Sequence, residues 1–385
     1  MKQTMSRAGA GKTRQRSIPT FFLIVSTMVS AAVLLLTIWP SSALARGCDA
    51  GVNVNGFQNL DAAQQETIVQ QLATSGVRCV RTSLRPDDKN IHLAKELQDR
   101  GIGLVLVTGA EFLPDAPVRP ADTERHMRSA RPLSWLDPER SRASYQVIFD
   151  KLEASGIVLA GVELGNEVNW TDFNGDFPIP GQGKAFTLED LSRDPEAQQV
   201  ARGFLQYLKV LAGLKLVRDH SKLNRQTPII SAGMAAVTGS AWQQKLKVDG
   251  VSIPATYAYL RAHGLDALVD GYGVHYYPPE VKPGDTAAAT QRLSVLDNQI
   301  FPPGNAKPYW LTEWGFSSKA TSSQEDQSRA RSVTEMRNYF LRLFREGRLR
   351  GVFWYVWNEP DLSSIYRNGA LMEAGKQATA PMMAQ

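Results

Sequence analysis

The chain has 385 residues, of which 43% are hydrophobic and 21% charged. This composition excludes a disordered or fibrous protein, because it supplies enough apolar side chains for a large core. The net charge of +5 arises in residues 1–45, which hold five Lys or Arg and no Asp or Glu. The rest of the chain has 38 cations and 38 carboxylates, so we expect no binding of nucleic acid, polyanions or anionic membranes.

Residues 1–45 have the pattern of a secretory signal peptide. A basic start is followed by an apolar stretch over residues 18–39 and by an A-x-A ending at residues 43–45, which suits a cleavage site. We therefore expect an exported protein, periplasmic or extracellular, whose mature part is residues 46–385. The apolar stretch is also long enough to span a bilayer, so the alternative is an uncleaved anchor in the inner membrane with the rest facing the periplasm.

The chain has two cysteines, Cys48 and Cys79, and both follow the leader. An even pair of cysteines in an exported protein can form a disulfide bond. Each lies beside a predicted strand, and the two strands are neighbours along the chain. We expect Cys48 and Cys79 to be bonded to each other, and the alternative is a pair of reduced, buried thiols.

Eight short runs rich in β-branched and aromatic residues predict strands. Segments with helical periodicity separate them, and such an alternation predicts parallel strands joined by crossovers. Eight units of this kind predict a closed (β/α)8 TIM barrel. The predicted strands are 51–56, 79–84, 104–108, 162–166, 228–232, 272–277, 309–313 and 352–357, and the predicted helices include 60–75, 89–100, 140–154, 197–220, 255–262 and 324–345.

We expect one barrel domain over residues 46–385, because no linker interrupts the alternation. An open dinucleotide-binding sheet is excluded, since the turn after the first strand, residues 55–58, lacks the required glycines. Two loops, 111–137 and 170–195, are much longer than usual and follow the third and fourth strands. They belong to the C-terminal face, where barrel enzymes carry their active sites. The segment after residue 360 is too short for a long eighth helix.

Two glutamates follow or end barrel strands. The fourth strand ends in Gly165-Asn166-Glu167, and the seventh contains Glu313 near its end. Two carboxyl groups at one barrel mouth can perform glycoside hydrolysis, in which one group donates a proton to the leaving oxygen and the other attacks the anomeric carbon. Burial and neighbouring charges separate the two pKa values so that each group can do its part.

These motifs resemble the clan A retaining glycoside hydrolases, families 5 and 39 most of all. The resemblance extends over residues 46–385, including the closing segment 369–372. It implies that Glu167 is the acid/base, that Glu313 is the nucleophile, and that Asn166 binds the sugar 2-hydroxyl. Family 5 normally has Asn-Glu-Pro after the fourth strand, whereas this chain has Val168 at the third position.

The string Asn-Glu-Pro does occur in this chain, but after the eighth strand, where it includes Glu359. Strand order favours Glu167 as the acid, because Glu167 already occupies the fourth strand. We interpret Glu359 as a loop carboxylate or a helix-start residue.

The resemblance also implies supporting residues. Arg81 on the second strand would hold the nucleophile ionised, the alternative being a structural salt bridge. In the His-x-Tyr pattern of the sixth strand, Tyr277 would contact the nucleophile and His275 the substrate, the alternative for His275 being a buried core position. Glu163 shares strand parity with Glu167, so we expect it deeper in the barrel as a structural carboxylate paired with a cation.

Aromatic side chains near the mouth are candidates for a sugar-stacking platform, because the CH groups of a pyranose pack well on an aromatic face. The candidates are Trp354 and Trp357 on the eighth strand, and Trp314 and Trp170 beside the two glutamates. Each of them is equally compatible with the core.

No spacing of the five histidines is typical of a metal site, and no Gly-x-Ser-x-Gly motif is present, so we expect no metal and no cofactor. Together these features predict an exported, monomeric retaining β-glycosidase that degrades a polysaccharide or oligosaccharide. The alternatives are a non-catalytic carbohydrate-binding or polysaccharide-assembly barrel, and a transglycosylase that uses the same residues.

Overall fold

The computed structural model describes residues 48–281, 285–316, 322–357 and 364–383. The predicted leader 1–45 and Glu359 lie outside these residues. Residues 41–385 belong to one compact unit, which is the unit described below. In the part of the chain that the structure describes, none of the helices is both long and apolar enough to cross a membrane.

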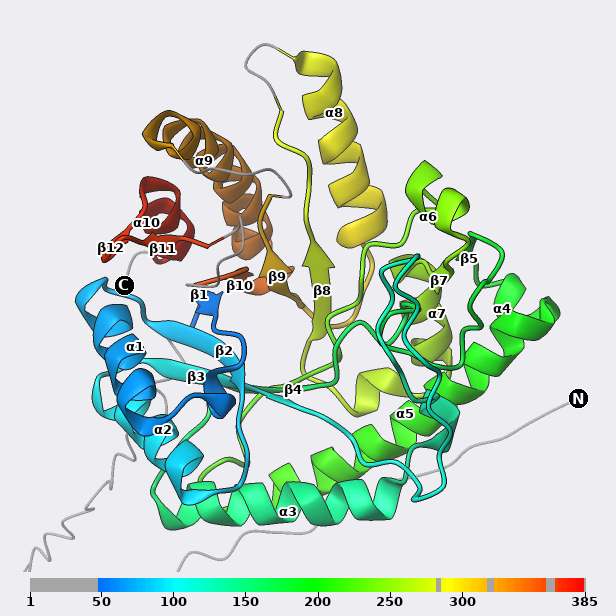
Figure 1. Cartoon of the computed structure of the whole chain (residues 1–385), viewed down its shortest axis with the longest axis horizontal. Coiled ribbons are helices and arrows are strands. Elements are labelled where there is room, and N and C mark those ends of the chain that lie inside the picture. Colours follow the sequence, from blue (N-terminus) through cyan, green and yellow to red (C-terminus); the bar gives the residue numbers. More distant parts are fainter. Residues whose placement is uncertain (1–47, 282–284, 317–321, 358–363, 384–385) are drawn as a thin grey trace, which may run out of the picture. The chain divides into compact units, whose positions relative to one another are not determined.

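Eight parallel strands form the centre of the fold (Figure 1). Their order in the sheet is β6-β4-β3-β2-β1-β10-β9-β8. Parallel bridges between Ile230 and Gly271 and between Met234 and Val274 join the two edges, so the sheet closes into the expected (β/α)8 barrel. The strands are β1 Ala50–Asn53, β2 Cys79–Ser83, β3 Gly103–Thr108, β4 Gly161–Leu164, β6 Ile229–Ile230, β8 Tyr272–Tyr276, β9 Tyr309–Trp314 and β10 Leu349–Trp354.

Helices follow the strands as the periodicity predicts. Two of them, α3 and α5, begin with an Asp-Pro pair, in which Asp137 or Asp194 accepts hydrogen bonds from the first backbone N–H groups. The last helix is short, as expected. The helices are α1 Ala62–Thr74, α2 Asp88–Asp99, α3 Pro138–Ala154, α4 Asp190–Arg193, α5 Pro195–His220, α6 Ala241–Leu246, α7 Ile253–Ala262, α8 Thr286–Val295, α9 Ser323–Arg345 and α10 Glu373–Thr379.

A small apolar cluster begins at the N-terminal ends of β2 and β9, with Cys79 and Trp310. Cys48 and Cys79 form a disulfide bond within this cluster, with their Cα atoms 5.2 Å apart. The rings of Trp310 and Phe353 stack there with their centroids 6.3 Å apart. The cluster also includes Val105, which pairs with Arg81 in the sheet, and Phe353 near the end of β10, so it extends up to the polar site.

The long loops at the C-terminal ends contain elements that the sequence analysis did not predict. Strand β5 Ala185–Phe186, in the loop after β4, pairs in parallel with β7 Gly250–Val251. The buried carboxylate of Asp249 accepts hydrogen bonds from the backbone N–H groups of Gln182 and Lys184, at 2.7 and 2.6 Å. The loop after β4 is thus fixed to the segment after β6.

Candidate active site

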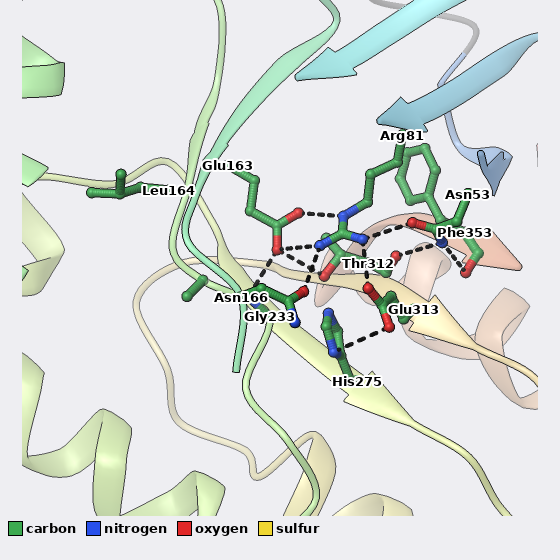
Figure 2. Close-up of polar contacts among 12 residues, drawn as sticks. Asn53, Arg81, Glu163, Leu164, Asn166, Gly233, His275, Thr312, Glu313 and Phe353 are labelled. Atoms are coloured by element: carbon green, nitrogen blue, oxygen red, sulfur yellow. Dashed lines mark hydrogen bonds and ion pairs between the residues drawn. The ribbon is translucent and has the colours of Figure 1, made fainter. Parts of the chain in front are cut away.

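The residues expected in the site come together at the carboxyl ends of the barrel strands. Figure 2 shows the part around Arg81, with Glu163 pointing into the cluster and its neighbour Leu164 pointing away, as strand alternation requires. Above the cluster lies a cavity of about 600 Å³, of the size that small-molecule sites have. Expected site residues line it: Arg81, Asn166, Glu167, Tyr277 and Glu313.

Glu313 on β9 is surrounded by hydrogen-bond donors. Its Oε1 accepts a hydrogen bond from Arg81 Nη1 at 2.7 Å, and its Oε2 accepts one from the Tyr277 hydroxyl at 2.5 Å. Burial by itself raises the pKa of Glu313, but the charges of His275 and Arg81 and these hydrogen bonds outweigh it and lower the pKa below its ordinary value. Glu313 is therefore held as a carboxylate, which is the form a nucleophile needs.

Arg81 on β2 connects Glu313 with a second, deeper carboxylate. Its guanidinium bonds both oxygens of Glu163, at 2.6 and 3.0 Å, and it also donates to Asn53 at 2.7 Å. Glu163 is fully buried and accepts a further hydrogen bond from the backbone of Gly233 at 2.8 Å. Arg81 thus makes the contact with Glu313 and the structural salt bridge at the same time, and Glu163 is the paired, buried carboxylate that was expected.

Glu167 follows β4 in an unusual backbone conformation. Its φ is 44°, in the left-handed region that few residues other than glycine adopt, and Gly165 two residues earlier has a φ of 81°. The backbone N–H of Glu167 donates to the carbonyl of Gly233 at 2.9 Å, which fixes the turn to the segment after β6. Strained non-glycine residues of this kind cluster at functional sites.

His275 does not lie where a substrate contact would require it. The sequence analysis expects it to face the substrate, whereas its side chain is 1% exposed and lies between the two glutamates. Its Nδ1 is 2.9 Å from Glu167 and 3.5 Å from Glu313. The reason is a register shift between Val274 and His275, which aligns His275 with Glu313 in the sheet.

The surroundings of His275 favour its charged form. Burial by itself lowers its pKa, but Glu313 and Glu167 outweigh this effect and raise the pKa above the ordinary value. A Cβ at Gly233 would lie 2.0 Å from His275 Nε2, so the ring fits only because position 233 is glycine. We therefore interpret His275 as a positioning residue for both carboxyl groups.

The tryptophans expected to form a sugar platform belong to the core instead. Trp314 and Trp354 are both 0% exposed, and their rings meet edge to face with centroids 4.8 Å apart. Trp314 also packs edge to face on Phe340 of α9, at 5.0 Å. The physical reason is strand alternation: Glu313 faces into the barrel, so Trp314, its neighbour on β9, faces the helices.

The other two tryptophan candidates are not in the cavity lining either. Trp357 is buried and stacks on Tyr366, with centroids 4.7 Å apart. Trp170 is half-buried and lies 6.2 Å from the exposed ring of Trp242.

Sequence reasoning missed several residues that line the cavity. Tyr355 lies two positions beyond Phe353, so alternation along β10 could have indicated that it faces the barrel mouth. Its hydroxyl accepts a hydrogen bond from Asn55 at 2.6 Å, and its ring meets Tyr277 edge to face at 5.8 Å. The long loops contribute Arg128, Asp172 and Phe173, for which no local sequence signal exists.

Glu167, His275 and Glu313 form the one group, among the residues that the structure describes, whose ligand atoms lie close enough to hold a metal ion. These atoms lie within 4.8 Å of one another. The guanidinium of Arg81 is already 2.7 Å from Glu313 and supplies the local positive charge. We therefore assign the three residues to a hydrogen-bonded site.

The comparisons with known proteins concern the fold as a whole. No protein-family model and no curated protein matches the chain. Among solved structures, ZgEngAGH5_4 in complex with a cellotriose aligns with a TM-score of 0.50 and 14% identity, over 90% of this chain and 99% of that one. The chain therefore shares the (β/α)8 barrel fold of that structure.

Two further solved structures are similar at lower scores. The GH39 enzyme from Xanthomonas axonopodis pv. citri has a TM-score of 0.48 and 14% identity over 87% of this chain, and the alignment spans 66% of that enzyme. The endo-1,4-beta-mannanase from Rhizomucor miehei has a TM-score of 0.45 and 11% identity, over 87% of this chain and 94% of that one. The fold is carried by the first alignment, at a TM-score of 0.50 and 14% identity. An activity does not follow from it and has to be argued from the site.

Proposed function

We propose that this protein is a retaining β-glycosidase that hydrolyses O-glycosidic bonds of a polysaccharide or oligosaccharide. The observation that carries the proposal is the spacing of the two carboxyl groups. One oxygen of Glu167 and one of Glu313 lie within 4.8 Å of each other. Retaining enzymes hold their carboxyl groups about 5–5.5 Å apart, whereas inverting enzymes need about 6.5–9.5 Å to admit a water molecule.

The surroundings of each group support its role in a double displacement. Glu313, ionised beside Arg81 and Tyr277, attacks the anomeric carbon while Glu167 protonates the departing oxygen. Glu167 then removes a proton from water, which releases the sugar from Glu313. Asn166 accepts from Arg81 at 3.3 Å through its Oδ1, so its amide nitrogen is left to donate to a sugar hydroxyl.

Export remains part of the proposal. It is supported by the basic and apolar leader and by the disulfide bond of Cys48 and Cys79, since such bonds persist in oxidising compartments. N-terminal sequencing of the protein purified from its native host tests whether the leader is cleaved. A start near residue 46 is expected, and a start at residue 1 would favour the uncleaved anchor.

The activity is tested by sugar release from a panel of β-glucans, mannans, xylans and bacterial exopolysaccharides. Wild type is compared with Glu313→Gln and with the matched control Glu335→Gln, a carboxylate that pairs with Arg292 at the protein surface. We expect release by wild type and by the control, and a loss of at least a thousandfold in Glu313→Gln. Equal release by all three would reject Glu313 as the nucleophile. Products longer than the substrate would indicate a transglycosylase, and binding of a glycan without release would favour the non-catalytic barrel.

A further inference from the structure

Hydrogen bonds join the two long loops, 111–137 and 170–195, which together form one wall of the cavity. Arg119 in the first loop donates hydrogen bonds to three backbone carbonyls of the second, those of Thr171, Asn174 and Phe177, at 2.6, 3.1 and 2.9 Å. The second loop approaches closely at Gly175, where a Cβ would lie 2.7 Å from the carbonyl of Ala130. The wall is therefore fixed before any ligand arrives.

Three residues of this wall line the cavity: Arg128, Asp172 and Phe173. The backbone N–H of Arg128 donates to one oxygen of Asp172 at 2.6 Å, and its Nε lies 3.3 Å from the other oxygen. The guanidinium of Arg128 also lies over the ring of Phe173, 5.1 Å from its centroid. We refer to these three residues as the loop clasp.

We propose that the loop clasp is a subsite for a second, uncharged sugar unit, beyond the unit held between Glu167 and Glu313. The inference rests on the proposed function and extends it: the substrate is a neutral oligosaccharide or polysaccharide, and the glycoside of a single sugar is a poor substrate.

The chemistry of the clasp suits a neutral sugar. Phe173 offers an aromatic edge or face to the CH groups of a pyranose. Arg128 has its Nε committed to Asp172, while the Nη groups of its 71% exposed side chain remain available to donate to hydroxyls. Since Asp172 neutralises Arg128, the clasp has no net charge with which to attract a carboxylate.

The rest of the cavity points to the same substrate class. Its other cation, Arg81, is 4% exposed and is taken up by Glu163 and Glu313. Apart from the clasp, Arg81 and the two glutamates, the described residues of the lining are uncharged and rich in amides and hydroxyls, such as Asn55, Gln58 and Ser83. Groups of this kind recognise sugar hydroxyls by hydrogen bonding. Among the described lining residues, each cation already has a carboxylate partner, so none is left over for a uronate.

The test compares two substrates built from the sugar that the panel identifies: its neutral oligosaccharides and its 4-nitrophenyl β-glycoside. The variants are Phe173→Ala and Arg128→Ala. The matched control is Arg125→Ala, because Arg125 lies in the same loop and pairs with Asp122 at 2.7 Å without lining the cavity. For the two clasp variants we expect kcat/KM on the oligosaccharide to fall at least tenfold more than on the aryl glycoside, mainly through KM. We expect the control to match wild type on both.

Equal losses on the two substrates, or the same loss in Arg125→Ala, would overturn the subsite.

Calorimetric binding separates this inference from the proposed function. Cello-, laminari-, manno- and xylo-oligosaccharides and an oligouronate are titrated into Glu313→Gln, with and without Arg128→Ala. Binding of a neutral oligosaccharide that Arg128→Ala weakens at least tenfold supports the subsite, even if wild type cleaves nothing and the proposed function fails. Tighter binding of the oligouronate, or no binding of any neutral oligosaccharide, overturns it, even if aryl glycosides are cleaved.

Discussion

The two glutamates of the site differ in the donors around them. Glu313 contacts a permanent cation, Arg81, and a phenol, Tyr277, whereas Glu167 contacts neither. His275 lies close to both glutamates. The pKa of Glu313 is therefore lowered in spite of its burial. Such a difference between two neighbouring carboxyl groups is what a division into nucleophile and proton donor requires.

The lowered pKa of Glu313 predicts the acid side of the pH profile. Activity requires the carboxylate, so kcat/KM of the wild type is expected to fall only below the ordinary pKa of 4.5. Tyr277→Phe removes one donor to Glu313 and raises its pKa, so the acid limb moves to higher pH. The activity of this variant relative to wild type is then lower at pH 4 than at pH 7. A profile whose acid limb does not move would contradict the role assigned to Tyr277.

At the scale of elements, strand alternation decides which side chains reach the site. On β9 and just past β10, Glu313 and Tyr355 face the barrel mouth, while Trp314 and Trp354 face the helices. The sequence contains this alternation, but a choice of aromatic residues by type alone selects the two tryptophans. Of the aromatic residues at positions 353 to 355, Tyr355 is the one that lines the cavity.

Substitutions at the neighbouring positions 354 and 355 are expected to affect different properties, namely stability at 354 and activity at 355. Trp354→Ala empties a buried position and lowers the free energy of unfolding by about 3–5 kcal/mol. Tyr355→Ala leaves the melting temperature within a few degrees of wild type and lowers kcat/KM at least tenfold, because the ring lines the cavity. Thermal unfolding and kinetics of both variants check this. A stable Trp354→Ala protein with reduced activity would mean that the tryptophan is the platform after all.

How far the sequence predicts the structure depends on whether a signal is local. The barrel strands and most of α3 and α5 follow from periodicity, although both helices begin two residues before the predicted starts at 140 and 197. The places of Glu167 and Glu313 follow from strand order. The β5–β7 pair and the clasp of Arg128 with Asp172 depend on contacts between distant segments, for which one sequence has no pattern. The place of His275 beside Glu313 depends on an irregularity in the β8–β9 pairing, where Thr312 is an extra residue on β9, and alternation alone cannot anticipate it.

At the scale of the whole molecule, the disulfide bond and the candidate active site lie at opposite ends of the barrel. The disulfide bond lies at the N-terminal ends of β1 and β2, and the charged cluster and the cavity lie at the C-terminal ends of the strands. Changes at one end should therefore leave the other largely intact, since distant sites act almost independently.

The disulfide bond between Cys48 and Cys79 offers a test of this separation. The bond closes a loop of 31 residues, for which loop-closure entropy gives about 3–4 kcal/mol. We expect the double substitution Cys48→Ser and Cys79→Ser to lower the melting temperature by several degrees, while kcat/KM at 25 °C stays within twofold of wild type. Addition of a reductant should lower the melting temperature of the wild type and leave that of the double variant unchanged. A loss of activity at temperatures where the variant is folded would show that the two ends are coupled.

The central claim is that Glu313 and Glu167 carry out a double displacement. The most direct measurement is the anomeric configuration of the first product, followed by proton NMR during hydrolysis of a β-linked substrate. We expect the β anomer to appear first and the α anomer to appear later by mutarotation, because two successive inversions retain the configuration. An α anomer formed first would contradict the account and show that water attacks the sugar directly.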